Sequence, residues 1–285
     1  MKLKRFINIF ILCSIIINIT FVSPKASNIS EGSSNDIKVN ARSAIAIDGE
    51  NGEVLFEQNG YELIPMASTT KILTAYIAIE REDLDTVFTV TKNATAVRGS
   101  KVGYSEGEKV TVRELLYGLM YRSGNDAAIT IAENISGSIE EFSVLMNHYA
   151  KSLGIIDSHF ESPHGLDSQN HYSTAYDLAM LTKVCMKNNT FREIVGTKEI
   201  SREKYGFTRD YSNINKILYK IPGANGVKTG YTGQAGKCLV SSVNCNGRDI
   251  IIVVLNCYDR WNVTEYIYNH IVETVAFQMD KSQHC

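Results

Sequence analysis

The sequence predicts an α+β fold of three layers, in which an antiparallel sheet is flanked by helices and carries an inserted helical subdomain. Strand-like segments lie near both ends of the chain, at residues 41–57 and 224–257, whereas helical patterns fill the middle, roughly residues 92–190. Residues 260–278 have the pattern of a last helix. The most economical arrangement is one sheet built from both ends and covered by the first and last helices.

The N-terminus differs from the rest of the chain. Three basic residues precede an uncharged apolar run at residues 6–22. This order predicts a signal peptide at residues 1–26, although a run of this length also reaches the short limit of an uncleaved N-terminal anchor. Residues 27–40 are mostly polar and are predicted to be a flexible link to a domain at 41–285.

Composition narrows the class of protein. The 285 residues are 44% hydrophobic and 21% charged, which suits one large core or two tightly joined subdomains. The formal net charge is −2, and removal of a leader with four positive charges makes the mature chain more acidic. Because no basic patch is present, nucleic acid is not an expected partner, and membrane contact is expected only through an uncleaved leader.

The first elements are a hairpin and a helix. The hairpin spans residues 41–57, and its turn is the Gly-Glu-Asn-Gly sequence at residues 49–52. Ser68 opens the helix, whose apolar run at residues 72–79 contains no Gly or Pro. Residues 86–91 predict a short strand.

The middle of the chain predicts helices at residues 110–137 and 139–153. A loop rich in His, Pro and Gly follows at residues 157–172. The next helix, residues 174–187, begins with a threonine cap and has Asp177 in the capping-box position.

The C-terminal part predicts strands at residues 199–211 and 224–257. Asn246-Gly247 marks a hairpin between the last two strands. No C-terminal β domain is expected after the last helix.

Ser68 and Lys71 form the first candidate catalytic pair. Positions i and i+3 of a helix share one face, so the amine can reach the hydroxyl. Serine needs such a base to act as a nucleophile, and lysine acts as a base only if burial or a like charge, for which Lys228 is a candidate, lowers its pKa. The spacing alone is a weak signal, since Ser201 and Lys204 share it without a long apolar helix behind them.

Two further motifs strengthen the prediction. Ser123-Gly124-Asn125 joins two segments of helical pattern, and Lys228-Thr229-Gly230 precedes an apolar run at residues 238–243. Each motif alone fits an ordinary loop or turn. Their order, and their placement beside apolar elements, weigh against these ordinary interpretations, and together the motifs resemble the three-part constellation of serine-acylating enzymes.

The three motifs resemble those of the D-alanyl-D-alanine carboxypeptidases, the low-molecular-mass penicillin-binding proteins, which are serine peptidases of the penicillin-recognising superfamily. Residues 162–167 (Ser-Pro-His-Gly-Leu-Asp), 171–179, 44–48 and 260–262 (Arg-Trp-Asn) are also typical of that family. The resemblance covers most of the chain after the leader. It implies a β-lactamase/DD-peptidase-like fold that needs no cofactor.

The resemblance implies a catalytic role for three residues. Ser68 would attack the peptide carbonyl between two D-alanines, Lys71 would accept its proton, and Ser123 would relay a proton to the leaving amine. The product of the first step would be a serine ester.

The resemblance also implies a substrate-binding set. Asn125 would hold the substrate amide and Lys71, and Gly230 would allow the strand to approach the substrate. The N–H groups of Ser68 and Tyr231 would form an oxyanion hole, although some members have His where this chain has Tyr231. The terminal carboxylate would be bound by Lys228, Thr229 and Arg260.

The implied substrate is a peptidoglycan stem peptide that ends in D-Ala-D-Ala. β-Lactams would act as covalent inhibitors, and the protein would be exported to the cell wall or to the outer face of the cytoplasmic membrane. Such enzymes act in cell-wall synthesis and cell shape.

Two other functions remain open. A class A-like β-lactamase would carry Ser-Asp-Asn in place of Ser123-Gly124-Asn125, together with a Glu-x-x-Leu-Asn pattern that the sequence lacks. The other is a wall-binding or β-lactam-sensing domain that is acylated without turnover. Sequence alone distinguishes such a domain poorly from the carboxypeptidase.

Metal and disulfide sites are not expected. His159, His164 and His171 lie close in sequence, but without the helical spacing of a zinc site, so no metal is predicted. The five cysteines after the leader include no Cys-x-x-Cys pair and predict no structural disulfide. They are Cys185, Cys238, Cys245, Cys257 and Cys285.

Overall fold

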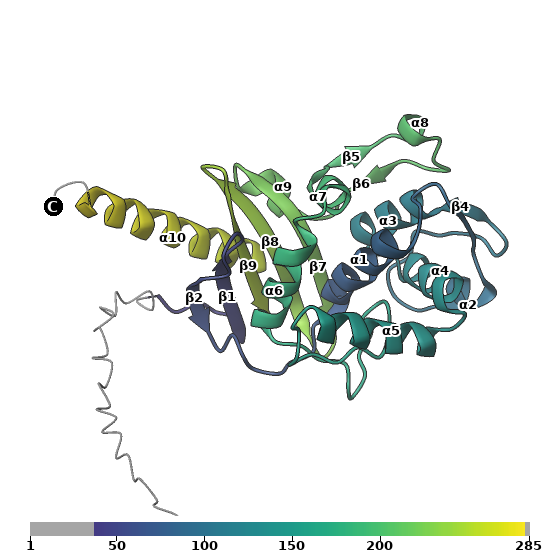
Figure 1. Ribbon diagram of the computed structural model, residues 1–285, viewed down its shortest axis with the longest axis horizontal. Coiled ribbons are helices and arrows are strands. Elements are labelled where there is room, and N and C mark those ends of the chain that lie inside the picture. Colours follow the sequence, from purple (N-terminus) through teal and green to yellow (C-terminus); the bar gives the residue numbers. More distant parts are fainter. Residues whose placement is uncertain (1–36, 283–285) are drawn as a thin grey trace, which may run out of the picture. The chain divides into compact units, whose positions relative to one another are not determined.

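The computed structural model describes residues 37–282, with side chains as far as residue 274. The expected leader, most of the expected link and Cys285 lie outside the described residues. The elements, shown in Figure 1, are β1 (Ser43–Asp48), β2 (Val54–Gln58), η1 (Ala67–Thr70), α1 (Lys71–Arg81), β3 (Val87–Thr89), α2 (Lys92–Ala96), β4 (Lys109–Thr111), α3 (Val112–Tyr121), α4 (Asn125–Ser136), α5 (Ile139–Ser152), α6 (Ala175–Cys185), α7 (Asn189–Gly196), β5 (Glu199–Ile200), α8 (Arg202–Tyr205), β6 (Tyr211–Ser212), α9 (Ile217–Lys220), β7 (Ala224–Thr232), β8 (Gly236–Cys245), β9 (Arg248–Leu255) and α10 (Arg260–Ser282).

The main sheet joins strands from both ends of the described chain, as predicted. Its order is β2-β1-β9-β8-β7, and every neighbouring pair is antiparallel. In β1, Ile45 and Ile47 face one core, whereas Ala44 and Ala46 face a second core on the other side of the sheet. This alternation follows from the two-residue period of a strand and gives the sheet two buried faces.

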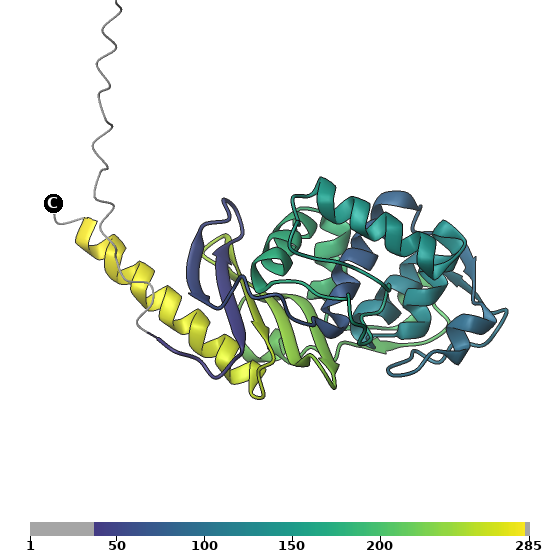
Figure 2. The same cartoon turned by 90° about the horizontal axis from the view of Figure 1, so that it is seen from below.

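Different helices cover the two faces of the sheet (Figures 1 and 2). α10 packs on one face through Ile267 and Ile271, and α6 packs against β9 and β1 on the other. The prediction that the first helix covers the sheet is wrong in this respect. α1 lies among α3, α4, α5 and α6 and reaches the sheet at its β7 edge, because a helix that is apolar on most sides is buried among other helices.

Local signals in the sequence are confirmed at the β1–β2 turn and at the start of α6. Asp48 Oδ1 accepts hydrogen bonds from the backbone N–H groups of Glu50 and Asn51, at 2.7 and 3.2 Å. Thr174 Oγ1 accepts from Asp177 N at 2.9 Å and caps α6. The Asp177 carboxylate does not complete a capping box, because it binds the N–H of Asp157 and the hydroxyl of Ser158 instead.

The strand-rich prediction for residues 199–211 is wrong. β5 and β6 are two residues long each and enclose the short helix α8. The side chain of Glu114 holds this segment, which we call the arm (residues 199–212). Its buried carboxylate accepts hydrogen bonds from Thr208 N, Thr208 Oγ1 and Tyr211 OH. The helices α7 and α9 were also not expected, since each is too short to give a periodic apolar pattern.

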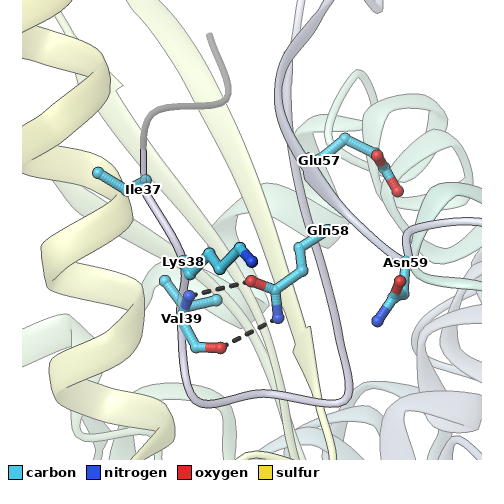
Figure 3. A pocket seen from close by; sticks show the side chains of 6 residues that line it. All are labelled: Ile37, Lys38, Val39, Glu57, Gln58 and Asn59. Carbon is cyan, nitrogen blue, oxygen red and sulfur yellow. Dashed lines mark hydrogen bonds between the residues drawn. The ribbon is translucent and has the colours of Figure 1, made fainter.

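Part of the expected link is bound to the domain. A pocket of about 410 Å³ lies between residues 37–39 and residues 57–59. Figure 3 shows the side chains that line it. The Gln58 amide pairs with both backbone groups of Val39, at 3.0 Å each, and also donates to Ala41 O. This pocket lies along β2, at the opposite edge of the sheet from β7, and holds none of the three motifs.

Two further properties concern the described residues only. Their cysteines, Cys185, Cys238, Cys245 and Cys257, are free thiols. None of the helices between residues 37 and 282 combines the length and the apolar character required to cross a membrane.

Candidate active site

The candidate nucleophile lies in a tight turn directly before α1. Ser68 is half-buried in the 3-10 turn η1, and Lys71 is the first residue of α1. Lys71 Nζ lies 3.0 Å from Ser68 Oγ, as the spacing of the two residues predicts. The preceding residue, Ala67, has a φ of 50°, a left-handed conformation that an alanine rarely adopts.

The Lys71 amine is fully buried among acceptors. Besides Ser68, its Nζ contacts Asn125 Oδ1 at 2.8 Å and the backbone oxygen of His164 at 2.7 Å. Burial lowers the pKa of Lys71 well below its usual value, the nearby Lys228 charge lowers it further, and Asp126 acts in the opposite direction. These surroundings favour the uncharged amine that a general base requires.

Ser123 and Lys228 form a second pair in the same site. Ser123 lies between α3 and α4 with a φ of 55°, and Lys228 Nζ donates to its Oγ at 2.9 Å. Lys228 Nζ also donates to Thr229 O at 2.8 Å. Burial, followed by the charge of Arg260, lowers the pKa of Lys228 to about 7.

Strand β7 lies directly against the nucleophile turn. A Cβ at Gly230 would lie 3.0 Å from Ala67 Cβ and 3.1 Å from Ser68 N, which is closer than ordinary van der Waals contact, so glycine favours this approach. Thr229 is buried, whereas the side chain of Tyr231 is 67% exposed at the end of the strand. The glycine at position 230 therefore serves the contact between the strand and η1.

The Arg260 side chain contacts backbone oxygens of β7 and β8. Its guanidinium donates to Gly230 O at 2.6 Å and to Cys238 O at 2.9 Å, and it lies 4.7 Å from the centre of the Trp261 ring. In this arrangement Arg260 supports the hairpin of β7 and β8 and influences Lys228 by its charge.

The structure adds a loop that the motifs do not identify. In residues 157–172, the backbone oxygen of His164 binds Lys71, and that of Pro163 accepts from Thr74 Oγ1 at 2.7 Å. Gly165 has a φ of 82°, and a Cβ there would lie 2.0 Å from Ala67 O. The sequence marks this loop by its content of His, Pro and Gly and by the family resemblance of residues 162–167, but it does not predict the contact with Lys71.

Histidine side chains fix the loop through hydrogen bonds. His171 Nδ1 accepts from Glu161 N at 3.0 Å, and its Nε2 lies 2.7 Å from Thr70 Oγ1. Because a backbone N–H can only donate, Nε2 carries the proton and donates to the threonine. His159 Nδ1 lies 2.6 Å from Asn170 O, and the part of the chain that is described contains no cluster of three metal-ligating side chains.

Acid is expected to weaken the fold through His171. Burial lowers its pKa to about 4, whereas an unfolded histidine titrates near 6.5. The unfolded chain therefore binds the proton first as pH falls. The contribution is complete above about pH 6.5 and is lost toward pH 4, by up to about 3 kcal/mol. Urea unfolding between pH 7.5 and 4.5 measures this decline.

The matched variants are His171→Asn and His148→Asn, since His148 is exposed. His171→Asn should reduce the pH dependence of the free energy of unfolding, and His148→Asn should leave it as in the wild type. Part of the dependence should persist in His171→Asn, because burial also lowers the pKa of His164, to about 3. An unchanged slope in His171→Asn would contradict the assignment.

Sequence comparisons agree with the geometry of the site. A family model for D-alanyl-D-alanine carboxypeptidase matches residues 29–259. The D-alanyl-D-alanine carboxypeptidase DacF of Bacillus subtilis is 38% identical over 220 residues, which are 75% of this chain and 57% of that protein. DacC of Escherichia coli is 37% identical over 231 residues, 76% of this chain and 56% of that protein. The chain thus spans just over half the length of these relatives.

Solved structures give the same result. A Streptomyces DD-transpeptidase has a TM-score of 0.75 and 31% identity, and the match covers 84% of this chain and 97% of that one. The D-alanyl-D-alanine carboxypeptidase DacD of Francisella tularensis has a TM-score of 0.76 and 30% identity, over 82% of this chain and 70% of that one. With one family model matching from residue 29 to residue 259 and the three motifs meeting at Ser68, this chain belongs to the D-alanyl-D-alanine carboxypeptidase family.

Proposed function

We propose that this protein is a serine D-alanyl-D-alanine carboxypeptidase that removes the terminal D-alanine from peptidoglycan pentapeptide stems. The observation that carries the proposal is the 3.0 Å contact between Ser68 Oγ and the fully buried amine of Lys71. A buried lysine of lowered pKa next to a serine hydroxyl is the arrangement that activates serine without a histidine.

In the first step, Lys71 acts as the general base. An uncharged amine has two N–H bonds and one lone pair. Asn125 Oδ1 and the backbone oxygen of His164 accept hydrogen bonds from the two N–H groups, so the lone pair is directed to the Ser68 hydroxyl. Ser68 Oγ then bonds to the carbonyl carbon while its proton passes to Lys71.

In the second step, the bond to the leaving D-alanine breaks. Ser123 passes a proton to the leaving nitrogen, supplied through the Lys228 amine 2.9 Å from its hydroxyl. The N–H groups of Ser68 and Tyr231 stabilise the oxyanion, where loss of one donor costs about 3 kcal/mol in barrier. Water then adds to the ester carbonyl carbon and gives a proton to Lys228 through Ser123. Lys71 returns its proton to Ser68 Oγ as the ester bond breaks.

The terminal carboxylate of the substrate is assigned to Lys228 and Thr229 on β7. Both residues are buried beside the nucleophile, and a desolvated cation binds a carboxylate strongly. Arg260 contributes through the strand backbone and its charge. β-Lactams, which imitate the D-Ala-D-Ala end, are expected to acylate Ser68.

We also propose export, with the leader at residues 1–26 as the signal or anchor and the domain acting in the cell wall or at the outer face of the cytoplasmic membrane. Fractionation of cells that produce the full chain tests this, with a chain lacking residues 1–26 as the control. Recovery of the full chain only from the cytoplasm would contradict export.

Transpeptidation is the second candidate, because a structural relative that this chain matches over 97% of its length is named a DD-transpeptidase. Purified residues 27–285 should be incubated with a muropeptide pentapeptide and the products identified by mass. Loss of one alanine supports the carboxypeptidase, and a cross-linked dimer supports the transpeptidase. An unchanged pentapeptide would contradict both activities and would favour the β-lactam-sensing domain instead.

The β-lactamase alternative is less well supported, since the Glu-x-x-Leu-Asn pattern is missing and Gly124 replaces the aspartate of Ser-Asp-Asn. A chromogenic cephalosporin separates the two activities. Slow release of the acylated protein is expected, and rapid turnover would favour the β-lactamase.

A further inference from the structure

The residue after the second motif, Asp126, binds a neighbouring loop. Its carboxylate is fully buried and accepts hydrogen bonds from four backbone N–H groups. The donors are Val102 at 2.9 Å, Gly103 at 2.8 Å, Tyr104 at 3.4 Å and Ala127 at 2.9 Å. One side chain therefore ties residues 99–104 to the start of α4.

The same loop fixes Asn125. The backbone N–H of Asn125 donates to Ser100 O at 2.8 Å, and its side-chain Nδ2 donates to Arg98 O at 2.6 Å. With Nδ2 held in this way, Oδ1 points to Lys71 Nζ, 2.8 Å away. A movement of the loop would turn the amide away from the base.

Packing leaves the loop little freedom. A Cβ at Gly124 would lie 2.7 Å from Val102 Cγ2 and 2.8 Å from Asp126 Oδ1. A Cβ at Gly99, whose φ is 84°, would lie 2.8 Å from Asn125 Nδ2. The loop and the motif are thus in direct contact, and both glycines are required by that contact.

We propose that Asp126 is a positioning residue for acyl transfer, whose buried carboxylate holds residues 99–104 against α4 and thereby fixes Asn125 on the general base Lys71. This inference rests on the proposed function of Ser68 and Lys71. Asp126 itself touches none of the reacting atoms. Its effect reaches them through Asn125 and through its charge.

The charge gives a second, independent readout. The groups that face Lys71 are Lys228 from β7, His164 and His171 from the loop at 157–172, and Asp126 from α4. Among these Asp126 acts to raise the pKa of Lys71, against burial and Lys228. Removal of the charge should therefore move the acid limb of the acylation rate to lower pH.

Three variants separate these roles. Asp126→Asn keeps the size and removes the charge, whereas Asp126→Glu keeps the charge and displaces the carboxylate. Asp249→Asn is the matched control, because the Asp249 side chain is also buried and binds Arg192, Asn225 and Asn244 at the far end of the sheet. Urea unfolding of each variant measures its stability separately.

The rate constant of acylation by a fluorescent penicillin is then measured against pH. We expect the acylation rate constant per folded molecule to be about 100-fold lower in both Asp126 variants than in the wild type. The acid limb should move to lower pH only in Asp126→Asn. Asp249→Asn should keep the wild-type rate and limb.

The inference would be overturned if folded Asp126→Asn had the wild-type acylation rate constant and the wild-type acid limb. It would also be overturned if, in all three variants, the loss of acylation rate simply paralleled the loss of stability. If Asp126→Asn does not fold, Asp126→Glu carries the test, since a wild-type rate in that variant also overturns it. Absence of labelling in the wild type would instead overturn the proposed function.

Discussion

Ser68→Ala is expected to abolish covalent labelling by a fluorescent penicillin, with no residual slow phase. In the described site, Ser68 Oγ is the hydroxyl in contact with the buried Lys71 amine, and alanine leaves no atom to form the ester. The fold should persist, because the Ser68 side chain is half-buried and its other contact, to His164 O, is long at 3.4 Å. Gel fluorescence after incubation with the labelled penicillin measures the result.

The control is contained in the same chain. Ser201 and Lys204 repeat the Ser-x-x-Lys spacing on an exposed arm, where Lys204 Nζ lies over the Tyr205 ring instead. Ser201→Ala should therefore label as the wild type does. Labelling that persists in Ser68→Ala would contradict the assignment of the nucleophile, whichever result Ser201→Ala gives.

The comparison of these two serines indicates what could be predicted from the sequence. Spacing predicted the contact of Ser68 with Lys71, because helical geometry relates residues three apart. It could not separate Ser68 from Ser201, since burial depends on distant elements. The apolar run behind Ser68 and the order of the other motifs supplied that distinction.

The sequence motifs could not predict which backbone atoms contact the site. The oxygen of His164, which binds Lys71, belongs to a loop 93 residues away in sequence, and any residue type carries such an oxygen. Asp126 was also missed, because an acidic residue in the first turn of a helix is common for electrostatic reasons alone. Its four donors come mostly from a loop more than twenty residues earlier.

The fold was predicted best where local and long-range signals agree. The strands β1, β8 and β9 combine apolar runs with turn signals, and the sheet joins them as expected. Residues 199–211 were wrongly predicted to be strand-rich, because the side chain of Glu114, in another element, holds this segment. A buried side-chain anchor of this kind has no periodic pattern.

Lys71→Met is expected to lower the acylation rate constant by about three orders of magnitude, which is within the range of general base catalysis. Methionine has a similar length, and an apolar side chain tolerates the fully buried position without a desolvation penalty. The protein should therefore remain folded and bind penicillin without acylation. Stopped-flow labelling and urea unfolding together test this, and a rate within tenfold of the wild type would contradict the role of Lys71.

The pH dependence gives the sharper test of the same role. Acylation should rise with pH as Lys71 loses its proton. Below about pH 7 Lys228 keeps its positive charge, which lowers the pKa of Lys71, so Lys228→Gln should move the acid limb to higher pH. Asp126→Asn should move it to lower pH, because it removes a negative charge. Opposite shifts from neighbours of opposite charge are expected for a titrating group that feels both charges, as Lys71 does. Shifts of the same sign in both variants would exclude Lys71 as the group that limits the rate in acid.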